Sequence, residues 1–194
     1  SPHGHVDPGL FSDPKASFGS PADLFIIPDH YVTRMLYSAG VSYDHILKGN
    51  HREVWRTFCE HFYLFRGTPS GIWLTESLAE VFGIHEKPQR ENADVLYDEI
   101  ASRLDQPEFT PRRLFERFNI EVLATTDPAV DMLVEHRAIR DSDWEGHVIP
   151  TFRPDALVDI DAPGWHTQIE CLSEASGMTV HNYWTFIQAL EQRR

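Results

Sequence analysis

The sequence predicts an α/β fold: part of a (β/α)8 barrel with a large helical insert after its first strand. Three short strand-like runs are each followed by a loop, and each ends in polar or ionisable residues, as barrel strands do at their catalytic ends. A long stretch of helical periodicity separates the first run from the second. We therefore expect a first strand end and loop at 1–28, a helical insert at 29–118, and the second and third β/α units of an incomplete barrel at 119–194.

The number of strands limits how much of a barrel the chain can form. A closed barrel needs eight parallel strands and about 250 residues, whereas this chain has 194 residues and three strand candidates. The opening His3-Gly4-His5 also has the form of a strand end whose earlier residues are missing. The sequence thus predicts a fragment truncated at both ends.

Composition indicates a globular protein with a packed core, since 41% of the residues are hydrophobic and 12% aromatic. A net charge of -13 with dispersed basic residues disfavours nucleic acid and anionic membranes as partners. No apolar run approaches the roughly 20 residues of a spanning helix. Two cysteines without CxxC spacing, Cys59 and Cys171, are typical of a cytoplasmic protein. The aromatic helices of the insert offer apolar surface for a homo-oligomer interface.

Helix signals dominate the insert. A helix is expected over Asp29 to Ser38, where Gly40 can close it. A second begins after Asn50, and its apolar residues recur at helical spacing as far as Phe65. Three more helices are expected at 71–82, 91–104 and 111–118.

The last third of the chain shows a strand, loop and helix rhythm. One β-prone run begins at Ile120 and ends in Thr125-Thr126-Asp127-Pro128, and another spans 147–152 and ends at Arg153. For Asp127, which precedes Pro128, the favoured interpretation is the N-cap of the following helix. Closing helices are expected at 165–176 and 180–192, the second capped by Thr179.

The most specific chemical feature is the HxH pair at the start. Side chains alternate along a strand, so His3 and His5 would project from one face and could bind one cation. The alternative is a chance pair or a flexible tail, because the chain holds eleven histidines. Eight others show no metal-ligand spacing and are expected to be surface or core residues: His45, His51, His61, His85, His136, His147, His166 and His181.

Two further positions leave alternatives open. Arg153, at a strand end, could bind a substrate carboxylate through its planar guanidinium, or form a salt bridge with Asp155. His30 and Tyr31 could move hydroxyl protons, but from their chemistry alone a helix-capping and packing role is favoured.

Six blocks of sequence together resemble the uronate isomerase family of the amidohydrolase superfamily. They follow the family in order and rough spacing over most of the chain, which makes them far more specific than one HxH pair. The blocks are PHGHVDP (2–8), DHY with RM (29–31, 34–35), EHFYLFRGTP (60–69), FERFNIEV (115–122), ATTD (124–127) and PTFRPD (150–155).

The resemblance implies an amidohydrolase-type barrel that interconverts D-glucuronate and D-fructuronate through an enediol. It implies that His3 and His5 bind a divalent metal, usually zinc, that His30 and Tyr31 relay the substrate's hydroxyl proton, and that Arg153 binds the carboxylate of a uronic acid. The family's strand-eight aspartate, which is a metal ligand and the principal base, has no counterpart in this sequence, and neither does its neighbouring arginine. Weak metal binding and no turnover are therefore expected of the chain alone.

Two alternative functions remain. One is a metal-dependent hydrolase or deaminase of the same superfamily, which would share the HxH pair but use a bound hydroxide as nucleophile. The other is a non-catalytic helical domain that binds a partner, in which the histidine pair belongs to a tail.

Overall fold

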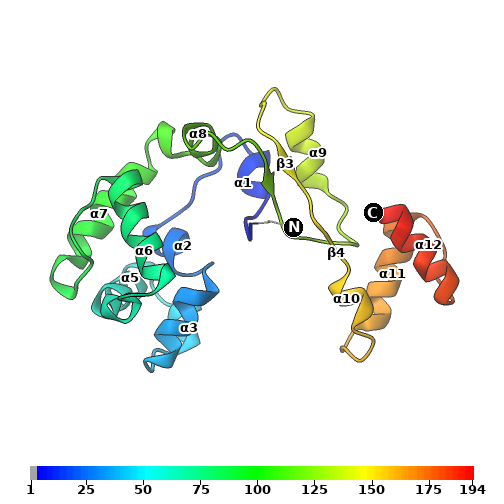
Figure 1. The fold of residues 1–194 in the computed structure, drawn as a ribbon, viewed down its shortest axis with the longest axis horizontal. Helices are drawn as coiled ribbons and strands as arrows, with labels where there is room; N and C mark the ends of the chain where they lie inside the picture. Colours follow the sequence, from blue (N-terminus) through cyan, green and yellow to red (C-terminus); the bar gives the residue numbers. More distant parts are fainter. Residues whose placement is uncertain (1–3) are drawn as a thin grey trace. The chain divides into compact units, whose positions relative to one another are not determined.

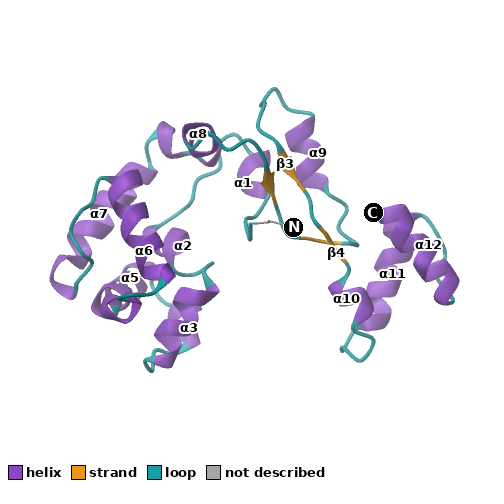
Figure 2. Ribbon diagram, in the orientation of Figure 1, coloured by secondary structure: helices purple, strands orange, loops and turns teal. Residues whose placement is uncertain are grey.

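The structure is a computed structural model that describes residues 4–194 and combines many helices with a few short strands (Figure 1 and Figure 2). It divides into two compact units. The helical unit comprises Ser17–Arg113, and the strand-containing unit is described over residues 4–16 and 114–194. The strand-containing unit therefore joins the start of the chain to its last third.

The helical unit contains no strand among its residues, which are all described. None of the helices in residues 4–194 is long and apolar enough to cross a membrane. The helices of this unit are α2 (Pro21–Phe25), α3 (His30–Ser38), α4 (Tyr43–Lys48), α5 (His51–Glu60), η1 (Phe62–Phe65), α6 (Pro69–Glu76), the π-helix η2 (Ser77–Val81), η3 (Arg90–Asn92), α7 (Ala93–Leu104) and η4 (Pro107–Phe109), and α8 (Pro111–Arg117) begins in it.

A side-chain cap begins α5 where the sequence predicts it. The Asn50 side chain accepts from the amides of Arg52 and Glu53 at the start of α5. The end of α5 differs from the prediction, because the helix stops at Glu60 and a separate 3-10 helix holds Phe62 and Phe65. The His61 amide bonds to the carbonyls of both Thr57 and Phe58, which tightens the last turn.

An aromatic core holds the helical unit together. The Trp55 ring is fully buried on α5, and its indole N–H donates to the carbonyl of Ala93 at 2.9 Å. This bond satisfies the one polar atom that the ring brings into the core. Phe25 and Phe58 contact the Trp55 ring directly. Three more rings continue the cluster through these two, with neighbouring centroids 5.4–5.7 Å apart: Phe65, Phe82 and Phe109.

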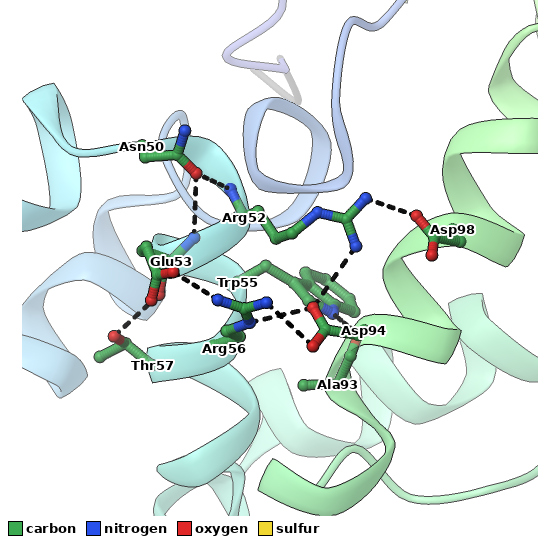
Figure 3. Close-up of polar contacts among 9 residues, drawn as sticks. All are labelled: Asn50, Arg52, Glu53, Trp55, Arg56, Thr57, Ala93, Asp94 and Asp98. Carbon is green, nitrogen blue, oxygen red and sulfur yellow. Dashed lines mark hydrogen bonds and ion pairs between the residues drawn. The ribbon is translucent and has the colours of Figure 1, made fainter.

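A charged network joins α5 to α7 on the surface of this unit (Figure 3). The Arg56 guanidinium donates two hydrogen bonds to Asp94, at 2.9 and 3.0 Å, and Arg52 donates to Asp98 and, at 3.4 Å, to Asp94. The hydrogen bonds from Arg56 and Arg52 lower the pKa of Asp94. The same pairings, with Asp98 for Arg52 and Asp94 for Arg56, raise the pKa of both arginines.

The strand-containing unit is built on two short parallel strand pairs. β1 pairs with β3 and places Leu123 opposite Val148, and β2 pairs with β4 and places Pro128 opposite Arg153. Parallel pairs with connecting helices are typical of β/α units. The elements are α1 (Gly9–Ser12), β1 (Leu123–Ala124), β2 (Asp127–Pro128), α9 (Val134–Arg140), β3 (Val148–Ile149), β4 (Phe152–Arg153), α10 (Asp155–Val158), α11 (Trp165–Ser176) and α12 (Tyr183–Arg193).

The structure corrects two predicted caps in this unit. Asp127 does not cap a helix: it is a strand residue of β2, and α9 begins only after Leu133. The final helix begins at Tyr183, where Asn182 rather than Thr179 caps it and accepts from the Thr185 amide. The helix Trp165–Ser176 has the predicted bounds.

Two apolar clusters form the core of this unit. The first lies around β1, β3, α1 and α9, where the rings of Phe11 and Trp144 stack 5.7 Å apart; its buried members are Phe11, Phe115, Ile139 and Val148. The second lies around α10, α11 and α12, with Ala129, Leu157, Leu172 and Ala189 buried. The first cluster packs against Val6 and so holds the start of the chain beside β1.

Candidate functional site

Only one member of the HxH pair, His5, lies in the described part of the chain. His3 lies outside the described residues. His5 is exposed, whereas Gly4 and Val6 on either side of it are partly buried. This alternation has the period of an extended segment with one face covered.

Two hydrogen bonds attach Gly4 to the end of β1. The Gly4 amide donates to the carbonyl of Ala124 at 2.7 Å, and the Gly4 carbonyl accepts from the hydroxyl of Thr126 at 3.0 Å. The residue between the two histidines is thus fixed to a segment more than one hundred positions away in the sequence.

The imidazole of His5 is a type of ligand found in divalent-metal sites. An exposed imidazole on an extended strand is a suitable zinc ligand, but protein zinc sites use at least three protein side chains. Within residues 4–194, no group of three histidine, cysteine or acidic side chains is arranged to hold a metal ion. His5 therefore offers one imidazole of the type that such a site uses.

Arg153 ends β4 and lies beside the end of β2. Its Nε donates to Asp155 Oδ2 at 3.0 Å, which is the salt bridge expected as one alternative from the sequence. The Arg153 side chain is 42% exposed, so solvent reaches the guanidinium and the ion pair with Asp155 lies on the surface. A bidentate carboxylate contact would use the guanidinium's other N–H groups.

His30 and Tyr31 form the first turn of α3 in the helical unit. Asp29 is the helix cap: its carboxylate accepts from the Tyr31 amide at 2.7 Å and from the Val32 amide at 3.2 Å. Both side chains are exposed, and their rings lie 4.1 Å apart. The side-chain cap of α3 thus comes from Asp29, and the rings of His30 and Tyr31 pack against each other on the surface.

A buried polar cluster at the ends of β1 and β2 was missed by sequence reasoning. Thr125 Oγ1 lies 2.7 Å from Asp127 Oδ2 and 2.8 Å from His136 Nε2, and all three residues are buried. A hydroxyl has one proton, so when Thr125 donates to Asp127, His136 must donate through Nε2. Only the Thr-Thr-Asp run was visible as a polar strand end, because His136 reaches it from α9.

The segment from Ala124 to Pro128 connects the features of the strand-containing unit. Ala124 and Thr126 bond to Gly4, Thr125 and Asp127 form the buried cluster, and Pro128 is paired with Arg153. One short run of chain therefore contacts both the backbone beside His5 and the backbone of Arg153.

Comparison with known proteins assigns the chain to a family. The glucuronate isomerase family model matches residues 2–194. The chain is 50% identical to a uronate isomerase of Nostoc punctiforme and 42% identical to one of Rhizobium meliloti, in each case over all of this chain. It spans 42% and 43% of the length of these two relatives.

Two solved structures have the same fold. The crystal structure of glucuronate isomerase from Caulobacter crescentus matches all of this chain and 42% of its own, with 44% identity and a TM-score of 0.95. Uronate isomerase from Thermotoga maritima matches 99% of this chain and 42% of its own, with 28% identity and a TM-score of 0.90. On the combined evidence of sequence and fold, this chain belongs to the glucuronate isomerase family.

Proposed function

We propose that the protein carrying this sequence is a metal-dependent uronate isomerase that converts D-glucuronate to D-fructuronate, and that this chain supplies part of its active site. The family match over residues 2–194 is the observation that supports this most strongly. The proposed architecture is part of an amidohydrolase-type (β/α)8 barrel, which the two parallel strand pairs and their flanking helices favour.

Each proposed role follows from the side chain's chemistry. Aldose–ketose isomerisation moves a proton between adjacent carbons through an enediol, so hydroxyl protons must move at the same time. The imidazole of His30 can accept and donate a proton and Tyr31 carries a phenol hydroxyl, and together they would relay that hydroxyl proton. Arg153 would bind the substrate carboxylate through two parallel N–H groups along one edge of its planar guanidinium, which match the two carboxylate oxygens.

We propose that His3 and His5 are two ligands of a divalent metal, most simply zinc. A bound divalent metal would supply Lewis-acid stabilisation of negative charge on a substrate oxygen. The exposed position of His5 and the two hydrogen bonds on Gly4 support this role.

Location and assembly are part of the same proposal. Cys59 and Cys171 are both free thiols, Cys59 buried and Cys171 partly buried, which suits a reducing cytoplasm. A homo-oligomer built through the helical unit would cover exposed apolar side chains there, such as Ile72 and Trp73.

The test measures ketose formation from D-glucuronate by the protein at its full natural length. We expect activity that a chelator removes and added zinc restores. His5→Ala should lower activity by about 100-fold or more, because a proposed metal ligand is removed. Arg153→Met should raise KM for glucuronate more than it lowers kcat, because Arg153 would bind the carboxylate equally in the bound substrate and in the transition state.

Arg140→Met is the matched control, since Arg140 is an exposed arginine paired with its neighbour Asp141. It should leave both kinetic constants unchanged. Absence of ketose in the presence of zinc, together with hydrolysis of an amide or ester, would favour a metal-dependent hydrolase or deaminase. Unchanged metal content and unchanged activity in His5→Ala would favour a non-catalytic interaction domain.

A further inference from the structure

We propose that Thr126 is a positioning residue for His5, the described member of the HxH pair: its hydroxyl holds the Gly4 carbonyl and thereby fixes the peptide from which His5 extends. The inference rests on the metal role proposed for His3 and His5. It adds a residue to that site which acts only through the backbone between the two ligands.

The hydrogen bonds of Gly4 follow a parallel ladder with one substitution. In a parallel pair, one residue donates to position j−1 of its neighbour and accepts from position j+1. Gly4 donates to the carbonyl of Ala124 and accepts from Thr126, but the donor is the Thr126 hydroxyl. A side-chain oxygen therefore provides the bond that a backbone amide usually provides, so one substitution can remove it without changing the backbone.

Hydrogen bonds of Thr125 hold the backbone next to Thr126 in place. The Thr125 amide donates to the carbonyl of Ile149 at 2.9 Å, and the Thr125 carbonyl accepts from the Thr151 hydroxyl at 2.5 Å. The Thr125 hydroxyl lies in the buried cluster with Asp127 and His136. Because successive side chains point to opposite faces of an extended segment, Thr125 anchors the segment inward while Thr126 reaches Gly4.

The consequence for metal binding follows from orientation. Residues that hold a ligand in place typically change metal affinity by about 10–100-fold when they are removed. Without the Thr126 bond, Gly4 keeps only the hydrogen bond from its amide to Ala124, and the peptide that joins Gly4 to His5 is no longer held at its carbonyl.

The experiment measures zinc affinity by competition with a chromophoric chelator, using the protein at its full natural length. Thr126→Val, which keeps the shape but removes the donor, should weaken zinc binding by about tenfold or more. Thr126→Ser keeps the hydroxyl and should restore affinity to within about twofold of the unmodified protein. The visible spectrum of the cobalt-substituted protein should change in Thr126→Val and return in Thr126→Ser.

Thr75→Val is the matched control, because the Thr75 hydroxyl also donates to a backbone carbonyl, that of Gly71, but in α6. It should leave zinc affinity unchanged. Thr126→Ala serves as a second donor-free variant if Thr126→Val does not fold. Zinc affinity equal to that of the unmodified protein in either donor-free variant, or no recovery in Thr126→Ser, overturns the inference. Unchanged affinity in His5→Ala instead overturns the proposed metal role.

Discussion

Each of the two units is stabilised by a different kind of interaction in its interior. In the helical unit, Trp55 and its neighbouring rings fill the interior, and the Arg56–Asp94 ion pair lies on the surface. In the strand-containing unit the strands are two residues long, and a hydroxyl, a carboxylate and an imidazole are buried at their ends. Short strands provide few backbone bonds, so side-chain hydrogen bonds contribute to holding their register.

The largest expected effect is on the aromatic core. Trp55→Ala should lower the free energy of unfolding by about 3–5 kcal/mol, because it removes a fully buried ring and leaves a cavity. Urea denaturation followed by circular dichroism measures the loss. Trp184→Ala is the control, since that ring is 73% exposed, and it should change stability by no more than about 0.5 kcal/mol. Equal effects of the two substitutions would contradict the role given to the core.

A smaller effect is expected in the buried polar cluster. Thr125→Val keeps the side-chain shape but leaves Asp127 Oδ2 and His136 Nε2 without the hydroxyl between them. We expect a loss of about 1–3 kcal/mol, the usual result of orphaning a buried polar group. The exposed Thr179→Val is the control. If the urea midpoint of Thr125→Val equals that of the control, side-chain hydrogen bonds do not stabilise the strand-containing unit.

The smallest effect concerns the surface network of the helical unit. The pKa of Asp94 is lowered in the folded state by Arg56 and Arg52, so its contribution to stability is present above the ordinary pKa of 3.8 and lost as pH falls through the lower, folded value. Asp94→Asn should therefore lower the thermal midpoint slightly at pH 7 and leave it nearly unchanged at the acid end. A difference that grows toward low pH would contradict this pairing. Thermal melts at several pH values make the measurement.

Helix starts in the helical unit could be predicted because their causes are local. Asn50 caps α5 through amides two and three residues ahead, and the apolar spacing from Val54 to Phe58 repeats within one or two turns. Where the helix stops was not predictable in the same way. The apolar pattern continues to Phe65, whereas the backbone tightens at His61.

The residues of the candidate site also differ in whether their contacts are with near or distant residues in the sequence. Residue types and spacing singled out His3, His5, His30, Tyr31 and Arg153 as candidates. The structure describes the last four within their own units. The ion pair of Arg153 with Asp155 is an interaction between near neighbours, and it was foreseen as one alternative. The role of His136 was not foreseen, since its partner Thr125 is eleven residues away, between β1 and β2.

By itself, the sequence determined the Asn50 cap of α5, the family resemblance and the candidate residues, because each depends on residue identities or on bonds between near neighbours. Only the tertiary structure decided that Asp127 belongs to a strand, that His136 joins a buried cluster, and that Thr126 holds Gly4. These contacts join residues from 2 to 122 positions apart, and which of them form depends on how the chain closes its loops and on which polar groups must find partners once they are buried.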